Sequence, residues 1–364
     1  MIFIRKSSSK FKYTADLVAK DRLFYTYYYT RVHTLAKKGV FMCTAIAING
    51  RNFYFGRTLD SEYDFSEKIV FAGRNFPFFK NNNHTQRYAI LGMAKLFEGY
   101  PLFFDGVNEK GLCIAALNYT GCAHYQKDRD GIAPYELIPL ILQTCKSIDE
   151  AKEVLRKTNI TDRFPSKDLG TASLHFLIAD KSGAIAVEPD KNGLNIYENP
   201  HGVLTNSPCY PYHAENLRSY LGLSSAEAKN RFSEKLELNP DYRGTGALGL
   251  PGDSSSPSRF VRSCFYKFNS TPLEGEEIEN ISRFFHIIGT SKQLEGAVKV
   301  KDGSVKTRYT CCINADTGMY YYTTYENSRV SAVSLSLEDV DSSDVSVFSL
   351  LNTEDILLQN KISR

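Results

Sequence analysis

Two apolar β-like runs on either side of an Asn-Gly pair constrain this chain more than any other feature of its sequence. The runs are CTAIAI and RNFYFGR, and the pair between them is Asn49-Gly50. Asn-Gly is the strongest short signal for a two-residue hairpin loop. With that loop, Cys43 would lie opposite Gly56, and both faces of the hairpin would be largely apolar. A hairpin of this kind must be covered on both sides.

The rest of the chain shows mixed α and β signals. Strands are predicted at 112–118, 174–179 and 184–188, with a second hairpin across 308–325. Helix starts are marked by a Pro or a capping box at Pro134, Ser147, Pro211 and Pro257. Because the strands come as hairpins and do not alternate regularly with helices, antiparallel sheets covered by helices are favoured.

Two motifs that suggest other chemistry lack their structural context. Gly244, Gly246 and Gly249 match a dinucleotide-binding GxGxxG pattern, but no strand precedes them and no helix follows. The Ser254–Ser256 run lacks the GxSxG of a nucleophile elbow. We interpret both as structural loops.

The charge is distributed unevenly along the chain. Residues 1–41 carry nine Lys and Arg against two acidic residues, a net charge of +7. Since the whole chain has a net charge of +3, the remainder has a net charge of −4. Because the basic excess lies in one segment with little apolar periodicity, nucleic acid is not expected as a partner. There is neither the apolar stretch of a secretory signal nor a run of about 20 apolar residues for membrane insertion.

The eight cysteines form neither CxxC pairs with partner histidines nor a dense disulfide pattern. We therefore expect reduced thiols, a cytoplasmic location and no metal site. One of these cysteines, Cys43, follows Met42. If the chain began at Met42, removal of the methionine would place a free α-amine on the same residue as the thiol, supplying nucleophile and base together.

Four polar residues could assist such a nucleophile. Arg57 could stabilise a thiolate, and Asp60 could hold the terminal ammonium. Asn118 and Asn206 are uncharged donors suited to the oxyanion of amide cleavage. Each also has an ordinary interpretation: a buried packing cysteine, a surface ion pair, and turn or cap asparagines.

The stretches MCTAIAI, FGRTLDSEY, DGVNEKGL, AALNY, LTNSP and GLPGDSSSPSRFVR resemble the choloylglycine hydrolase and penicillin V acylase family, and within it the bile salt hydrolases. The likeness runs from residue 42 to about 330. It implies an αββα sandwich of two stacked antiparallel sheets, a single domain over residues 43–364, and a leader, residues 1–42, that is absent from the active enzyme. The leader would be an upstream start assigned in error, a removable propeptide or a true extension.

The resemblance implies a role for each of nine residues. Those at the reacting centre are the nucleophile Cys43, the organising Arg57 and Asp60, the oxyanion donors Asn118 (backbone N–H) and Asn206 (side chain), and the supporting Arg259. Those at steroid-pocket positions are Leu59, Phe97 and Leu169, which ordinary packing would explain equally well.

The implied activity is hydrolysis of glycine- or taurine-conjugated bile salts through an acyl-thioester, without cofactor or metal, in a homotetramer. Penicillin V acylase activity is the alternative within the family. Two alternatives lie outside it. One is a Cys/His protease using His175, His213 or His286; the other is a non-catalytic binding relative. If Cys43 acts with its own amine, each His-to-Ala variant should retain activity.

Overall fold

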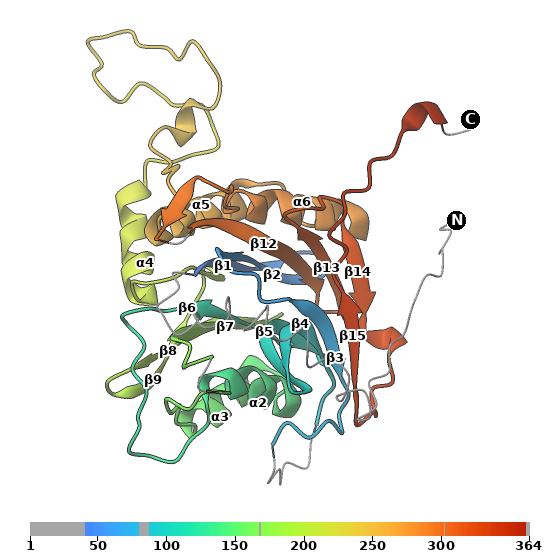
Figure 1. Ribbon diagram of the computed structural model, residues 1–364. Coiled ribbons are helices and arrows are strands. Elements are labelled where there is room, and N and C mark those ends of the chain that lie inside the picture. The colour runs from blue at the N-terminus through green and yellow to red at the C-terminus, as the bar shows by residue number, and fades with distance from the viewer. Residues whose placement is uncertain (1–40, 80–86, 167–168, 302, 362–364) are drawn as a thin grey trace.

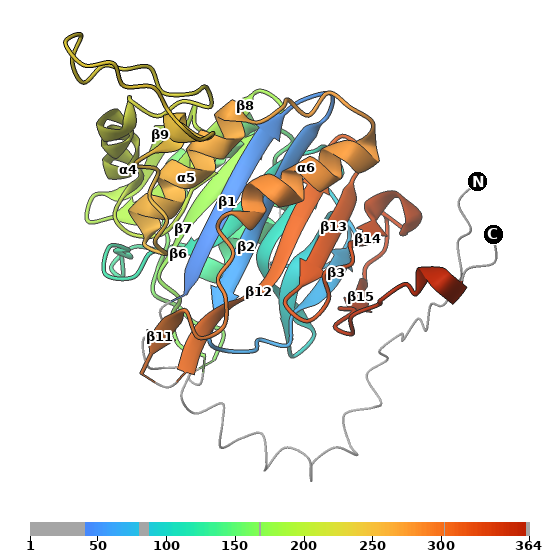
Figure 2. The ribbon, with the colours of Figure 1, turned by 90° about the horizontal axis from the view of Figure 1, so that it is seen from above.

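Two antiparallel sheets stack face to face, with helices on the outer side of each (Figure 1). The structure is a computed structural model that describes residues 41–79, 87–166, 169–301 and 303–361. The helices α5 (Ser256–Asn269) and α6 (Glu277–Gly289) lie across the upper sheet (Figures 1 and 2), and α2 (Leu137–Thr144) and α3 (Ile148–Arg156) lie beneath the lower one (Figure 1). This arrangement confirms the predicted α+β sandwich of four layers.

The upper sheet has seven strands in the order β10-β1-β2-β12-β13-β14, with β11 paired to β12. Its strands are β1 (Met42–Asn49), β2 (Phe53–Ser61), β10 (Val203–Leu204), β11 (Val298–Val300), β12 (Gly303–Asn314), β13 (Met319–Thr324) and β14 (Ser331–Ser334). The predicted hairpin across 308–325 corresponds to β12 and β13. Through this hairpin, β12 from the C-terminal third of the sequence pairs with β2.

The lower sheet has eight strands in the order β15-β3-β4-β5-β6-β7-β8-β9. They are β3 (Lys68–Ala72), β4 (Ile90–Phe97), β5 (Tyr100–Asn108), β6 (Cys113–Asn118), β7 (Leu174–Asp180), β8 (Gly183–Asp190), β9 (Gly193–Glu198) and β15 (Val345–Ser349). The three strands predicted from sequence are β6, β7 and β8. The closing strand β15, near the C-terminus, pairs with β3 from the first quarter of the sequence.

Helices cover the two outer faces. They are α2 (Leu137–Thr144), α3 (Ile148–Arg156), α4 (Tyr210–Asn216), α5 (Ser256–Asn269) and α6 (Glu277–Gly289), with short 3-10 turns η2 (Pro134–Glu136), η3 (Leu217–Tyr220), η4 (Thr245–Ala247), η5 (Leu335–Leu337) and η6 (Gln359–Lys361). The predicted starts agree with these bounds: Ser147 caps α3 by accepting from the Glu150 N–H, and Pro257 lies in the first turn of α5. The glycines of the GxGxxG match lie around η4, outside any strand or long helix.

The predicted register of the first hairpin is wrong. Cys43 pairs with Leu59, and Gly56 pairs with Ile46, because residues 50–52 form the connection and Asn49 pairs with Phe53. The reason is tertiary. The turn packs against the loop before α6, where the Arg51 N–H donates to the Leu273 carbonyl at 2.8 Å. Because the shift is odd, it puts Arg57 on the same face of the hairpin as Cys43.

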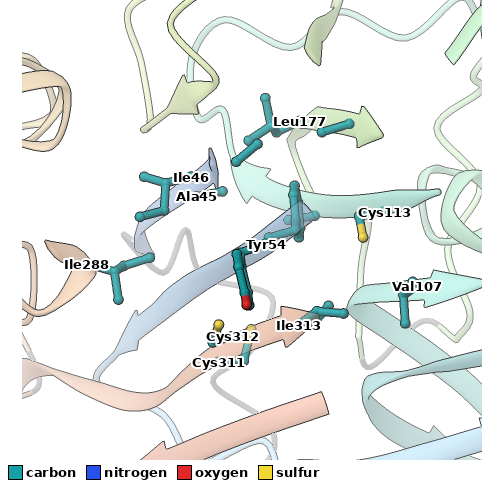
Figure 3. Close-up of a cluster of buried hydrophobic side chains, with 14 of the residues drawn as sticks. Ala45, Ile46, Tyr54, Val107, Cys113, Leu177, Ile288, Cys311, Cys312 and Ile313 are labelled. Atoms are coloured by element: carbon teal, nitrogen blue, oxygen red, sulfur yellow. The ribbon is translucent and has the colours of Figure 1, made fainter. Parts of the chain in front are cut away.

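The space between the sheets is filled by buried apolar side chains. Figure 3 shows part of this core, with Ala45 and Ile313 of the upper sheet and Val107 and Cys113 of the lower one. A second apolar cluster lies between the lower sheet and the helices α2 and α3. The β1–β2 hairpin is therefore covered on both faces, as its sequence predicted. None of the helices in the described part of the chain combines the length and apolar character that a membrane span needs.

Candidate active site

Cys43 lies near the start of β1 with its thiol against Arg57 of β2. The Arg57 Nη2 atom donates to the Cys43 Sγ atom at 2.7 Å. Both side chains are buried. A guanidinium at this distance stabilises negative charge on sulfur through a charge-assisted hydrogen bond.

Backbone carbonyls of three strands hold the Arg57 guanidinium in place. Its Nη1 atom donates to Phe104 O at 3.0 Å and to Ala116 O at 2.7 Å, and its Nε atom donates to Thr58 O at 3.2 Å. Phe104 and Ala116 belong to the lower sheet, so the side chain bridges the two sheets. A buried side chain with this many partners is fixed in one orientation.

Asn206 and Arg259 meet on the other side of Cys43. The Asn206 Oδ1 atom accepts from the Cys43 N–H at 2.8 Å and from Arg259 Nη2 at 2.6 Å. Arg259 Nη1 also donates to the Cys43 carbonyl at 2.5 Å and to Thr44 Oγ1 at 2.7 Å. Because both partners of Oδ1 are donors, the orientation of the Asn206 amide is determined.

Asn118, the last residue of β6, lies next to Asn206. The Asn206 Nδ2 atom donates to the Asn118 carbonyl at 2.9 Å, which leaves its second N–H free of this bond. The Asn118 side chain donates to Phe41 O at 3.2 Å and accepts from Thr120 Oγ1 at 2.6 Å. The two predicted oxyanion residues are thus brought together from β6 and from the turn after β10.

Asp60 is buried opposite Met42 in the β1–β2 ladder. Its carboxylate accepts from Thr307 Oγ1 at 2.6 Å and from Thr58 Oγ1 at 3.1 Å. Burial raises the pKa of Asp60 to about 6, against the opposing effects of the Arg259 charge and the two hydroxyls. Among the described residues no hydrogen bond joins Asp60 to Cys43. Asp60 is instead the ladder partner of Met42, the residue before Cys43.

The three predicted pocket residues come from three separate segments of the chain. Leu59 is buried and pairs directly with Cys43. Phe97 ends β4 opposite Tyr100, and the Leu169 N–H donates to Ser166 O at 3.1 Å. Both are half-buried, and within the described ranges neither makes a hydrogen bond or a ring contact with the residues around Cys43.

Residues before Cys43 occupy part of the site. The Cys43 nitrogen is the amide joined to Met42, so this chain has no free amine at the thiol. The Phe41 ring lies 5.3 Å from that of Phe65, which lies 5.5 Å from that of Phe104. Phe41 therefore adds an aromatic side chain to the apolar surface beside Cys43.

No described histidine makes a hydrogen bond to Cys43. His213 bonds Asn206 O through its Nε2 atom at 2.8 Å, and His175 bonds Thr205 O at 2.8 Å. His286 is exposed on α6, the helix layer outside the upper sheet. The thiol is paired with an arginine, which disfavours a Cys/His protease arrangement.

Two hydroxyl residues that hydrogen-bond the predicted site residues were not recognised from the sequence. Thr307 of β12 holds Asp60, and the Asn206 N–H donates to Ser256 Oγ at 2.8 Å. Neither lies in a local pattern that marks such a role, since Thr307 is 247 residues away from Asp60. In the described ranges no group of three or more His, Cys, Asp or Glu side chains is arranged to hold a metal ion.

Comparison with known proteins agrees with this geometry. A family model described as linear amide C–N hydrolases, choloylglycine hydrolase family, matches residues 43–348. The bile salt hydrolase/transferase of Lactiplantibacillus plantarum is 44% identical over 310 residues, which cover 84% of this chain and 95% of that protein. The bile salt hydrolase/transferase of Clostridium perfringens is 36% identical, with 84% and 96% covered.

Solved structures show the same likeness. A variant of the conjugated bile acid hydrolase from Clostridium perfringens superposes with a TM-score of 0.80 at 35% identity, covering 88% of this chain and all of that one. The penicillin V acylase of Agrobacterium tumefaciens superposes with a TM-score of 0.66 at 19% identity, covering 84% and 91%. At that identity the second likeness concerns the fold alone.

Proposed function

Because this chain belongs to the choloylglycine hydrolase family of linear amide C–N hydrolases, we propose that it cleaves the amide bond of glycine- or taurine-conjugated bile salts with Cys43 as nucleophile. The observation that carries the proposal is the 2.7 Å contact between Arg57 Nη2 and Cys43 Sγ, in a buried site where none of the histidines that the structure describes bonds the thiol. The named activities of the bacterial relatives support the substrate class.

The reaction begins when the Cys43 sulfur attacks the substrate carbonyl. The free N–H of Asn206 Nδ2 and the backbone N–H of Asn118 donate to the oxyanion that forms. The α-amine of Cys43 transfers the thiol proton to the departing glycine or taurine nitrogen. Water then attacks the acyl-thioester, releasing the bile acid and restoring the thiol.

Six further residues have proposed tasks. Arg57 stabilises the sulfur, Arg259 orients Asn206 and the Cys43 carbonyl, and Asp60 receives the terminal ammonium. Leu59, beside Cys43, contacts the steroid. Phe97 and Leu169 contribute to the same apolar pocket further from the thiol.

The active enzyme begins at Cys43. The amide bond from Met42 removes the required amine, and Phe41 contacts Asn118, one of the two proposed oxyanion residues. Residues 1–42 are therefore absent from the catalyst, and residues 43–364 form its single domain. This mature chain works without metal or organic cofactor, because its nucleophile, base and oxyanion donors are all protein groups.

We assign the enzyme to the bacterial cytoplasm as a homotetramer. All eight cysteines lie in described ranges and all are free thiols, which suits a reducing compartment. The projection between α4 and α5 exposes large apolar side chains that a second copy could cover (Figure 1).

The test compares the chain begun at Cys43 with the full 364-residue chain, using glycocholate, taurocholate and penicillin V as substrates. We expect hydrolysis of the bile salts by the shorter chain only. Cys43→Ala and Cys43→Ser should lower its kcat by at least about a thousandfold, because loss of a nucleophile removes the covalent route. The measurement is release of the free amine: glycine or taurine from the bile salts, and the penam amine from penicillin V.

Cys145→Ala is the matched control, since Cys145 is also buried but lies at the end of α2. It should retain wild-type kcat. Full activity of the intact chain would exclude an N-terminal nucleophile. Faster turnover of penicillin V than of either bile salt would favour the acylase alternative, and binding of glycocholate without turnover would indicate a non-catalytic relative.

A further inference from the structure

A second buried polar cluster lies behind the site, outside the shell that touches the thiol. Its members are Tyr119, just after β6, His175 of β7, Glu188 of β8, and Thr205, just after β10. Their side chains are between 0% and 4% exposed, which is unusual for a carboxylate and an imidazole. The chemistry proposed above uses none of them, so their burial requires another explanation.

The His175 imidazole connects the members of the cluster. Its Nε2–H donates to the Thr205 carbonyl at 2.8 Å, and its Nδ1 atom lies 3.1 Å from Glu188 Oε1. The Tyr119 hydroxyl donates to Glu188 Oε2 at 3.2 Å. The Tyr119 ring also stacks on the imidazole, with centroids 4.4 Å apart and planes 8° from parallel.

Hydrogen-bond counting determines where protons lie in the cluster. The Thr205 carbonyl only accepts, so Nε2 carries a hydrogen. Glu188 Oε1 accepts a further bond from the Tyr210 N–H at 2.9 Å. One more proton therefore lies between Nδ1 and Oε1, and the two groups together form an ion pair or its neutral equivalent. All polar atoms of the pair are satisfied, as buried groups require.

The cluster is attached to both proposed oxyanion residues. Thr205 immediately precedes Asn206, and Tyr119 immediately follows Asn118. The Asn206 side chain and the Asn118 carbonyl are themselves joined by the 2.9 Å bond from Nδ2. A movement of the His175–Glu188 pair would therefore shift both donors relative to the Cys43 sulfur.

We propose that His175 and Glu188 are positioning residues that hold Asn206 and Asn118 in the geometry needed to bind the oxyanion. The inference rests on the proposed function, because it assigns these residues to that same reaction. It also revises one expectation from the sequence: His175→Ala should lose activity even though no histidine acts on the thiol.

Glu188→Gln separates this role from simple filling of space. The glutamine has nearly the same shape, but the Oε1 position receives both the Tyr210 N–H and the His175 Nδ1 atom. An amide oxygen there leaves either a protonated imidazole without its counter-charge or a bare Nδ1 lone pair facing an oxygen, and an amide nitrogen opposes the Tyr210 N–H. Either orientation disturbs the bond from His175 that holds Thr205.

In the chain begun at Cys43, we expect Glu188→Gln to lower kcat for glycocholate about 10- to 100-fold, because small misplacements of catalytic groups have effects of this size. KM should change less than about threefold, since substrate contacts remain. The alkylation rate of Cys43 by iodoacetamide should stay at the wild-type value, because the pair acts on the oxyanion side.

Asn206→Ala supplies the double-mutant test. If Glu188 acts through Asn206, Glu188→Gln should lower kcat by less than about threefold in the Asn206→Ala background, because coupled residues are not additive. Glu109→Gln is the matched control. Glu109 is a largely buried carboxylate paired with Arg74 at the far end of β5. This variant should keep kcat.

Tyr119→Phe provides a second variant if the glutamine variant does not fold, since it removes only one hydroxyl. Its kcat should fall by a smaller factor than that of Glu188→Gln. Its effect should likewise shrink in the Asn206→Ala background. If the parent chain is active but its Glu188→Gln and Tyr119→Phe variants retain full kcat, this inference alone is overturned. The same holds if their effects on kcat multiply with that of Asn206→Ala. An inactive parent chain would overturn the proposed function and this inference with it.

Discussion

At the scale of single residues, the site combines buried charges with many specific partners. Arg57 and Arg259 are fully buried, yet each makes four hydrogen bonds to carbonyl, hydroxyl, amide or thiol groups. Asp60 has fewer compensating contacts, and burial raises its pKa to about 6. It is the site residue whose charge should respond to pH in the accessible range.

We predict that Asp60 makes the stability of the full chain depend on pH. Its pKa rises from 3.8 in the unfolded reference to about 6, so the protonated form is favoured in the folded state. The contribution of protonated Asp60 to the free energy of unfolding is fully present below pH 4 and is lost as pH rises through 6. A shift of this size corresponds to about 3 kcal/mol.

Urea unfolding of wild type and Asp60→Asn at pH 4 and pH 8 measures this contribution. The free energy of unfolding of wild type, relative to the variant, should fall by up to about 3 kcal/mol from the lower to the higher pH. A difference between the two proteins that does not change with pH would contradict the assigned origin.

At the scale of elements, the approach of β12 to β2 decides how the hairpin is held. Gly56 of β2 lies under β12, where a Cβ atom would be 2.0 Å from the Cys311 carbonyl oxygen and 2.8 Å from the Phe284 ring. The glycine therefore permits close contact with a strand and with α6, and it lies opposite Ile46 in the ladder, not opposite Cys43.

Gly56→Ala should consequently destabilise the fold. Backbone atoms cannot move aside as a flexible side chain does, so we expect a loss of at least about 2 kcal/mol in the free energy of unfolding. Gly222→Ala is the control, because a Cβ atom there meets nothing within 4 Å. Thermal unfolding followed by circular dichroism compares the two. Equal midpoints would show that β2 and β12 can separate without cost.

At the scale of the whole molecule, one segment extends away from the sandwich. The chain between α4 and α5 projects from the layered body (Figure 1). It exposes large apolar side chains that a monomer would leave in water, with exposures from 66% to 84% at Leu221, Phe232, Tyr242 and Leu248. Exposed apolar groups gathered in one segment are typical of an interaction surface.

We expect this projection to contact other copies of the chain in the proposed tetramer. Phe232→Ser should shift the protein toward smaller species in light scattering, because it removes an apolar group that is 82% exposed. Leu337→Ser, which changes a side chain that is 81% exposed on another part of the surface, should leave the mass unchanged. A wild-type protein that is monomeric at all concentrations would contradict the assembly.

The sequence by itself determined the layered class of the fold, several element starts and the identity of the candidate site residues. Alternation, the Asn-Gly pair, Pro positions and the Ser147 cap are local signals, so they can be recognised without a structure. The motifs that resemble the family named Cys43, Arg57, Asp60 and the two asparagines. The structure places these residues next to one another.

The tertiary structure alone decided the hairpin register, the partners of Asp60 and the cluster behind Asn206. Packing of the turn against Leu273 sets the register, because a contact with a distant loop outweighs the local turn preference. Thr307, His175 and Glu188 reach the site from other strands. Bonds of this kind join residues far apart in sequence, and no local pattern encodes them, because they form only when the two sheets come together.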